Sequence, residues 1–321
     1  MKGRNRPFYF YICTFHRVHT YINTVYNFKK GVGVLKTIAI VGGDAREWVL
    51  MKELAKLGYK LKILATPEAK THNNIEYYSS LNKVIKNTDV VIAPMSSTDE
   101  EGYLKATFID RKIKLDDRFF DLLKPGSLFI IGIARPYQKK LLKERKVNYV
   151  ELADLDEVAI LNAVPTAEGA LKIAIEETPV TIFESNCLVF GLGRVGISVA
   201  WRLKALGASC YGVTRNKAAV ARARDLGIKM LSYDNLTNYL EKMDLLINTV
   251  PAQVITREYI ELLQKEAVII DLASPPGGTD FNSADELGIK AILAPGLPGK
   301  VAPVTSGQIL SEVIPDIIKG N

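Results

Sequence analysis

The chain has 321 residues, of which 48% are hydrophobic and 24% are charged, so it is long enough for two domains with separate cores. Six of its 42 basic residues fall within residues 1–34, which contain no acidic residue, leaving 36 basic and 35 acidic residues in the remainder. This balance argues against nucleic-acid binding, and no run of about 18 apolar residues predicts a membrane span. The three cysteines form no CxxC pair, which argues against a disulfide framework or a metal site and favours a reducing cytoplasm.

Residues 1–34 are the first segment in chain order, and they are basic and rich in aromatic residues. We expect a disordered leader, or a translated stretch upstream of a native start at Leu35. The alternative is a basic aromatic arm that touches a membrane surface. An intact mass of the native protein decides whether these residues belong to it.

Residues 35–165 alternate between short apolar runs and amphipathic stretches. TIAIVGG, LKILA, DVVIAPM, SLFIIGIA and VNYVELA read as strands, and Glu47–Leu57 reads as a helix that ends at Gly58. Buried-looking strands separated by helices predict an α/β domain with a flavodoxin- or Rossmann-like parallel sheet. A linking helix is expected over residues 166–180.

Residues 181–305 repeat this alternation more regularly. CLVFG, SCYGVTR, IKMLSY, LLINTVP, AVIIDLAS and IKAILAPG predict six strands, and the helices between them end at glycines. Six such strands predict a doubly wound Rossmann domain that binds NAD(P). Residues 306–321 predict a C-terminal helix that packs back on the N-terminal domain.

The stretch FGLGRVG places Gly191, Gly193 and Gly196 in GxGxxG spacing after a strand and before a helix. That context is required of a dinucleotide fingerprint, in which the helix N-terminus faces the pyrophosphate. We therefore expect Gly191–Gly196, including Arg194 and Val195, to bind the cofactor. The alternative is a glycine turn that binds nothing.

The end of the next strand carries Thr214, Arg215 and Asn216, where NAD-binding folds place an acidic residue. A guanidinium without a carboxylate suits a 2′-phosphate, so we expect NADP, with NAD possible. The alternative is a surface arginine that stacks on adenine and accepts either cofactor.

Two later strand ends are expected to touch the cofactor, because ligands bind beyond the carboxyl ends of parallel strands. The residues concerned are Thr249, Val250, Pro251, Ala273 and Ser274. Both stretches could also be ordinary turns.

No histidine follows His72, which disfavours histidine-driven oxidation of an alcohol or hydroxy acid. Polar residues in loops rich in glycine and proline remain as candidates, and each alone could be a cap or a surface residue. The expected substrate-binding residues are Arg46, Ser96, Ser97 and Arg135. The expected catalytic residues are Glu168, Lys300 if it is desolvated, and Thr166, which is also a plausible helix N-cap.

The stretches IAIVGGDAR, NAVPTAEGA, VFGLGRVG, INTVP, DLASPPGGTDF and APGLPGKVAPVTSGQIL together resemble the dipicolinate synthase A-subunit family over residues 36–320. The resemblance implies a cytoplasmic enzyme in the mother cell of a spore-forming bacterium. It implies oxidation of a dihydrodipicolinate-level intermediate of the lysine pathway to pyridine-2,6-dicarboxylate, with NADP as the usual cofactor. It also implies that the partner is the flavoprotein-like B subunit of dipicolinate synthase, and a homo-oligomer is possible.

Within that resemblance, arginines and Lys300 suit a dicarboxylate, and Glu168 is our hypothetical proton acceptor. The product is aromatic, so holding the ring against the nicotinamide matters more than a strong base. Two alternatives stay open: an NADP-linked 2-hydroxy-acid dehydrogenase, and a nucleotide-binding subunit that does no chemistry.

Overall fold

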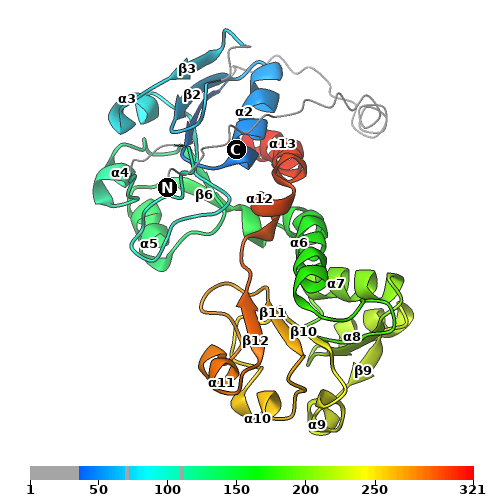
Figure 1. The fold of residues 1–321 in the computed structure, drawn as a ribbon. Helices are drawn as coiled ribbons and strands as arrows, with labels where there is room; N and C mark the ends of the chain where they lie inside the picture. Colours follow the sequence, from blue (N-terminus) through cyan, green and yellow to red (C-terminus); the bar gives the residue numbers. More distant parts are fainter. Residues whose placement is uncertain (1–35, 69–71, 109–111) are drawn as a thin grey trace, which may run out of the picture. The chain divides into compact units, whose positions relative to one another are not determined.

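The structure is a computed structural model that describes residues 36–68, 72–108 and 112–321. The leader expected over residues 1–34 lies outside the described residues. Helices and strands carry the labels used in Figure 1.

Six parallel strands form the first sheet, in the order β3-β2-β1-β4-β5-β6. The strands are β1 (Thr37–Val41), β2 (Lys60–Leu64), β3 (Ile75–Tyr77), β4 (Val90–Ile92), β5 (Leu128–Ile131) and β6 (Asn148–Glu151). The helices that connect them are α2 (Ala45–Lys56), α3 (Leu81–Ile85), α4 (Asp117–Asp121) and α5 (Pro136–Glu144). The sequence predicts five of these strands and misses β3, which has three residues and none of them buried.

Six more parallel strands form the second sheet, in the order β12-β11-β10-β7-β8-β9. The strands are β7 (Asn186–Phe190), β8 (Ser209–Val213), β9 (Lys229–Leu231), β10 (Leu245–Asn248), β11 (Val268–Asp271) and β12 (Lys290–Leu293). The helices are α7 (Arg194–Ala205), α8 (Lys217–Asp225), α9 (Thr237–Leu240), α10 (Arg257–Ile260) and α11 (Phe281–Glu286). Both sheets have the Rossmann strand order, which confirms the predicted α/β fold class.

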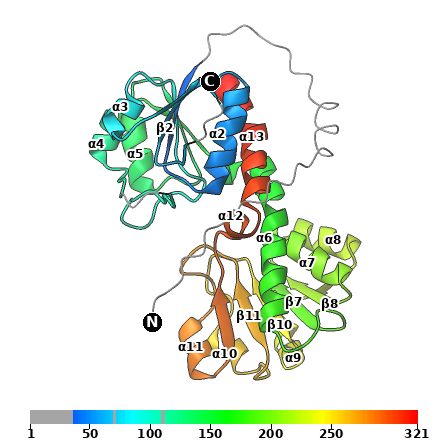
Figure 2. The ribbon, with the colours of Figure 1, turned by 45° about the horizontal axis from the view of Figure 1, so that its top comes forward.

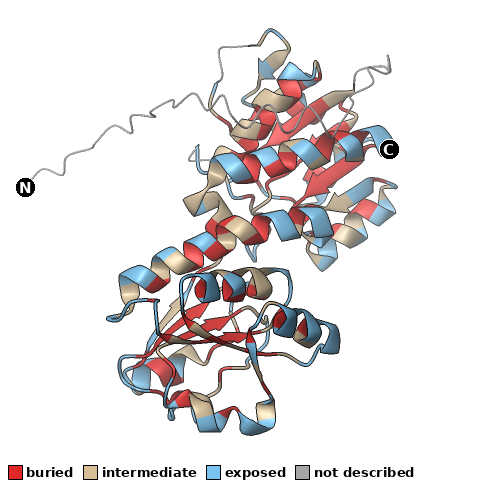
Figure 3. Ribbon diagram, turned by 90° about the vertical axis from the view of Figure 1, so that its right-hand side faces the viewer, coloured by how far each residue is buried: buried red, intermediate tan, exposed pale blue. Residues whose placement is uncertain are grey.

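Each sheet is buried on both faces, as expected for parallel strands covered by helices (Figure 3). In β1, Ile38 and Ile40 join the core under α2, whereas Ala39 and Val41 join the core on the opposite face. In β7, Cys187 and Val189 face one core while Leu188 and Phe190 face the other. Strand side chains alternate between faces, so a continuous apolar run fills two cores at once.

The chain ends in α13 (Pro303–Gly320), which lies beside α2 at the first sheet (Figures 1 and 2). Leu310, Ile314 and Ile318 recur every fourth residue and enter the same core as Ile38. Gly307 allows the close approach, because a Cβ there would lie 2.6 Å from the Cβ of Val49. The helix begins at Pro303, three residues before the predicted start at Ser306.

The helix between the sheets, α6 (Asp156–Glu177), begins well before the predicted start at Thr166 and contains Pro165. The prediction that Thr166 caps a helix is wrong, because its hydroxyl donates to the Asn162 carbonyl within the helix at 2.7 Å. Among the described residues, α6 is the helix long and apolar enough to cross a membrane by length and composition. It packs against α7, α13 and α12 (Leu297–Val301), which bury part of its apolar surface, while Ile160, Leu161 and Ile175 stay exposed.

Candidate functional site

The glycine turn after β7 is shaped by what surrounds each glycine. Gly191 has a φ of +79°, which favours glycine, and a Cβ on Gly196 would lie 1.9 Å from the Gly191 carbonyl oxygen. Gly193 is different, because nothing lies within 4 Å of the place where its Cβ would be. Gly193 is also the N-cap of α7, so open space adjoins the helix N-terminus. This geometry fits the approach of a pyrophosphate to the backbone.

Thr249, at the end of β10, braces this turn. Its hydroxyl lies 2.9 Å from the carbonyl oxygen of Phe190 and 3.1 Å from that of Gly191. A Cβ on Gly191 would lie 2.7 Å from both the Thr249 Oγ1 and the Val250 Cγ2. Two predicted cofactor residues, Thr249 and Val250, therefore lie directly against the glycine turn.

A buried polar network ties together the loops after β10 and β11. Asp271 is fully buried, and its Oδ2 accepts from Asn248 Nδ2 (3.0 Å), the Gly278 amide (2.7 Å) and the Thr279 hydroxyl (2.7 Å). Its Oδ1 accepts from the Ala273 amide at 3.0 Å. This role of Asp271 was not predicted from the sequence, although an acidic residue at the end of a buried strand followed by glycines is a usable signal.

The other predicted residues of these loops differ in exposure. Ala273 is buried, whereas Pro251 and Ser274 are exposed. The Asp271 network therefore fixes the backbone of both loops while these two residues face solvent.

Arg215 lies just beyond β8 with an exposed side chain, and its guanidinium carbon is 5.4 Å from the ring centroid of Tyr233. None of its side-chain nitrogens donates a hydrogen bond to a described residue. Asn216 caps α8 by accepting from the Ala219 amide at 3.0 Å, and Thr214 accepts from the Asn216 amide at 3.3 Å. Of the three predicted residues, Arg215 is the one whose side-chain polar atoms make no hydrogen bond to a described residue, while the Thr214 O–H and the Asn216 Nδ2 can also still donate. The sequence analysis missed Tyr233.

Arg194, the first residue of α7, pairs with Asp156 of α6 at 3.0 Å. Both side chains are solvent-exposed, so the pair contributes little to stability. Its place next to Gly193 keeps Arg194 near the open side of the turn.

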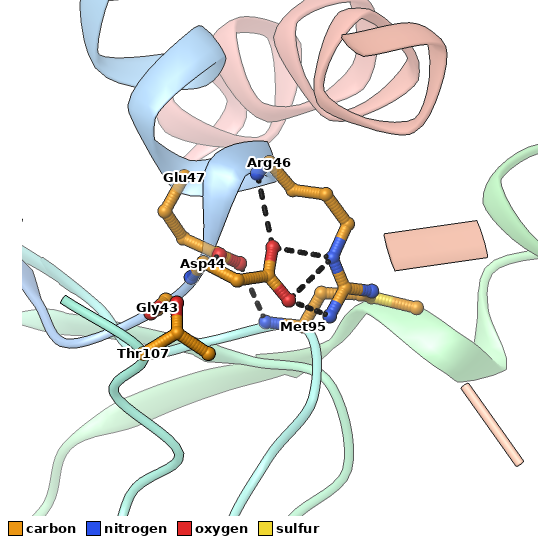
Figure 4. A network of polar contacts seen from close by, with 6 residues as sticks. All are labelled: Gly43, Asp44, Arg46, Glu47, Met95 and Thr107. Carbon is orange, nitrogen blue, oxygen red and sulfur yellow. Dashed lines mark hydrogen bonds and ion pairs between the residues drawn. The ribbon is translucent and has the colours of Figure 1, made fainter. Parts of the chain in front are cut away.

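In the first sheet, the turn after β1 is filled by the chain's own side chains (Figure 4). Asp44 caps α2, and its carboxylate binds the Nε and Nη2 of Arg46 at 2.9 and 2.7 Å. Glu47 is buried and accepts from the Asp44 amide at 2.8 Å and the Met95 amide at 2.9 Å. Asp44 and Glu47 have capping-box spacing, a signal the sequence analysis did not use.

Burial and charge act in opposite directions in this cluster. Burial raises the pKa of the Glu47 carboxyl above its ordinary range. Burial would also raise the pKa of Asp44, but hydrogen bonds to Arg46 and its positive charge outweigh it and hold that pKa below its usual value. Burial would lower the pKa of Arg46, and the hydrogen bonds to Asp44 reverse this. The Asp44–Arg46 pair is therefore charged in the folded state.

Three strand-end loops of the first sheet are interlocked. Ser97, with a φ of +61°, accepts from the Ile133 amide at 2.6 Å, and a Cβ on Gly132 would lie 2.0 Å from the Met95 carbonyl oxygen. Arg135 donates to the Thr98 carbonyl at 3.3 Å. The predicted substrate-binding residues Ser96, Ser97 and Arg135 thus lie on joined loops, and Arg46 lies in the first turn of α2, which contacts the same loops through Glu47 and Met95. The Ser96 hydroxyl is buried and has no partner among the described residues.

The predicted catalytic residues lie on two packed helices rather than in loops. Thr166 and Glu168 belong to α6 and Lys300 belongs to α12. Gly169 allows these helices to approach, since a Cβ there would lie 3.0 Å from the Leu297 Cβ.

Lys300 and Glu168 are both exposed, so the desolvation that would activate Lys300 is not present in this structure. The neighbouring Gly299 lies against Arg46, whose Cζ would be 3.0 Å from a Cβ at that position. The residue before Lys300 in the chain therefore lies against a predicted substrate-binding residue.

Known proteins resemble the chain over nearly its whole described length. Residues 37–153 match the family described as the N-terminal domain of the dipicolinate synthase A subunit, and residues 162–319 match alanine dehydrogenase/PNT, C-terminal domain. The dipicolinate synthase A subunit of Bacillus subtilis (strain 168) is 33% identical over 282 residues, covering 88% of this chain and 95% of that protein. The chain belongs to the dipicolinate synthase A-subunit family.

Solved structures support this membership. The crystal structure of the dipicolinate synthase A subunit from Bacillus halodurans matches with a TM-score of 0.84 and 34% identity, covering 89% of this chain and 99% of that one. A transhydrogenase from Sinorhizobium meliloti matches with a TM-score of 0.64 at 13% identity, covering 88% of this chain and 94% of that one, which shows a shared fold. The second domain is therefore an NAD(P)-binding Rossmann domain of the dehydrogenase type.

Proposed function

We propose that this member of the dipicolinate synthase A-subunit family is the NADP-dependent oxidoreductase that forms pyridine-2,6-dicarboxylate from a dihydrodipicolinate-level intermediate of the lysine pathway. The proposal places it in the mother-cell cytoplasm during spore formation, with the flavoprotein-like B subunit as partner. The observation that carries it is the open space over Gly193 at the start of α7, in a chain of this family.

NADP is proposed over NAD because of the chemistry at the end of β8. Arg215 has a guanidinium with uncommitted N–H donors, and Thr214 and Asn216 beside it carry no negative charge. A carboxylate there would repel a 2′-phosphate and favour a ribose hydroxyl. A guanidinium binds phosphate oxygens through paired N–H groups.

The dicarboxylate is proposed to bind at the loops of the N-terminal domain, residues 35–165. Arg46 uses its Nε and Nη2 for Asp44, which leaves Nη1 without a hydrogen bond to a described residue. Arg135 uses one nitrogen for a backbone carbonyl, and Ser96 and Ser97 lie on the adjoining loop. Two guanidinium groups, one in the first turn of α2 and one at the start of α5, suit two carboxylates on one ring.

The reaction removes one hydride and one proton from the dihydropyridine ring. NADP⁺ supplies the hydride acceptor when it is bound in the second domain. The arginines orient the carboxylates, and the aromatic product makes the step downhill without a strongly basic side chain. Glu168 is proposed to take the proton and pass it to water, since its carboxylate is exposed. Thr166 on α6 and Lys300 on α12 are proposed as further catalytic residues.

The deciding experiment is a coupled assay of the purified chain. Freshly made product of dihydrodipicolinate synthase is supplied with NADP⁺ or NAD⁺, each with and without the B subunit, and both reduced cofactor and the ultraviolet band of the product are followed. Formation of both by the isolated chain supports the proposal. No turnover in any mixture, despite cofactor binding, would indicate a partner protein without chemistry of its own. Oxidation of simple 2-hydroxy acids instead would indicate a hydroxy-acid dehydrogenase.

A further inference from the structure

The feature that extends the proposed function is Tyr233, which follows the neighbouring strand β9 and whose ring contacts Arg215. Strands β8 and β9 are paired so that Val213 lies opposite Leu231. Arg215 and Tyr233 each follow that pair by two residues, which brings them to the same edge of the sheet. The guanidinium carbon of Arg215 lies 5.4 Å from the Tyr233 ring centroid, within range of a cation–π contact.

Tyr233 is held more firmly than Arg215. Its ring is half-buried against the core that contains Leu231, Leu236 and Leu240. It begins a single helical turn, Tyr233–Asn235, and the Asn235 side chain accepts from the Ser232 amide at 3.0 Å. Burial raises the pKa of Tyr233, with the Arg215 charge acting against it, so the phenol is neutral at physiological pH. The ring is therefore a fixed apolar surface on which an exposed arginine can rest.

We infer that Tyr233 is a positioning residue for NADP selectivity, which holds the Arg215 guanidinium in place to receive the 2′-phosphate. The inference rests on the proposed use of NADP. Stacking engages a face of the guanidinium and leaves its in-plane N–H groups free for phosphate oxygens. An exposed arginine otherwise samples many rotamers, and ordering it on binding costs affinity. The ring removes part of that cost before the cofactor arrives.

The test measures dissociation constants of NADP⁺ and NAD⁺ by calorimetry on the full chain. Tyr233→Leu is expected to weaken NADP⁺ binding about three- to tenfold, as expected for loss of a cation–π contact, and to leave NAD⁺ binding unchanged. Tyr233→Phe keeps the ring face and is expected to retain wild-type selectivity. Tyr239→Leu is the matched control, because Tyr239 pairs with Tyr211 in the same core and has no ring contact with Arg215.

A second comparison changes Arg215, whose side chain is exposed, so that the variant is expected to fold like the wild type. Arg215→Lys keeps the charge but loses the planar group, and is expected to lower the selectivity for NADP⁺ by at least as much as Tyr233→Leu. Adding Tyr233→Leu to Arg215→Lys is then expected to cause little further loss. Full additivity of the two changes would overturn the inference.

These outcomes separate the inference from the proposed function. If Arg215→Ala abolishes NADP⁺ selectivity while Tyr233→Leu leaves it intact, NADP recognition by Arg215 stands and the role of Tyr233 is refuted. If the wild type binds both cofactors equally and Arg215→Ala changes neither, the proposed NADP preference fails. Equal losses of NADP⁺ and NAD⁺ binding in Tyr233→Leu would reduce Tyr233 to a structural role.

Discussion

Gly193 and Gly196 belong to the same glycine motif but have different surroundings. A substitution at Gly193 should therefore affect cofactor binding, and one at Gly196 should affect stability. Gly193→Ala adds a methyl group to open space at a φ of −75°, so the free energy of unfolding should change by less than about 0.5 kcal/mol. The same methyl group occupies the space above the helix N-terminus, so NAD(P) binding should weaken by about tenfold or more. Calorimetric binding and urea unfolding measure the two effects.

Gly196→Ala is the matched variant, since its Cβ would lie 1.9 Å from a backbone oxygen. It should destabilise the protein by roughly 2 kcal/mol or more, because backbone atoms must shift. Equal stability of the two variants would contradict the distinction between these glycines.

Glu47 offers a second prediction for a single residue. Its two carboxylate oxygens each accept from a backbone amide, those of Asp44 and Met95. In Glu47→Gln only one acceptor oxygen remains, so a buried N–H loses its partner. The free energy of unfolding should therefore fall by about 1–3 kcal/mol. Glu53→Gln on the same helix, where the side chain forms a surface pair with Lys56, should cost less than about 0.5 kcal/mol. Equal effects of the two changes in urea denaturation would show that the Glu47 contacts contribute nothing to stability.

The glycine turn and the residues proposed to bind the cofactor could be located from sequence because the motif depends on local spacing. GxGxxG and Arg215 lie at fixed distances along one βαβ unit, so counting residues finds them. Tyr233 could not be found in this way, because its contact with Arg215 depends on the pairing of β8 with β9. Asp271 likewise acts through partners on another strand end and a later loop.

At the scale of elements, the strands were easier to predict than the helix between the domains. Apolar runs marked five strands of the first sheet and all six of the second. Pro165 and Gly169 made the middle of α6 look like a loop, since proline lacks the N–H that would bond to the carbonyl of Leu161. Packing against α7, α12 and α13 stabilises the helix across this position. Such packing is tertiary, so local propensity does not reveal it.

The pair of strands β7 and β8 gives a prediction about pH. Cys187 and Cys210 are register partners, and burial raises the pKa of their thiols to about 11 and about 12. Because these pKa values lie above the ordinary thiol value of 9.0, the stability from the neutral thiols is present below about pH 9 and is lost as the pH rises toward 11–12. Between about pH 8 and pH 10.5 the wild type should lose roughly 4 kcal/mol more than a Cys187→Ala/Cys210→Ala variant.

Urea unfolding at a series of pH values measures this loss. The double variant keeps the lysines and tyrosines that also titrate in this range, so it isolates the thiols. Parallel stability curves for the two proteins would contradict the prediction.

At the scale of the whole molecule, two sheets share one strand order but only one has an open turn. After β7 the space over Gly193 is free, whereas after β1 a Cβ on Gly43 would lie 2.6 Å from a Glu47 oxygen. Calorimetry should therefore find one NAD(P) bound per chain, and this one site should be about tenfold or more weaker in the Gly193→Ala variant. A second equivalent site retained by that variant would place a nucleotide at the first sheet, contrary to this geometry.

The capped start of α2 also affects how ligand binding by the first domain can change through mutation. Asp44 and Glu47 already satisfy and neutralise that helix end, so an anion at the first domain must be held by side chains such as Arg46 and Arg135. Each of those contacts can be removed or moved by one codon change. At the start of α7 the hydrogen-bond donors are backbone N–H groups. A substitution there cannot remove these donors and can only block access to them sterically. The carboxylate binding proposed for the first domain is thus open to stepwise mutation, whereas dinucleotide binding by the second is maintained by its geometry.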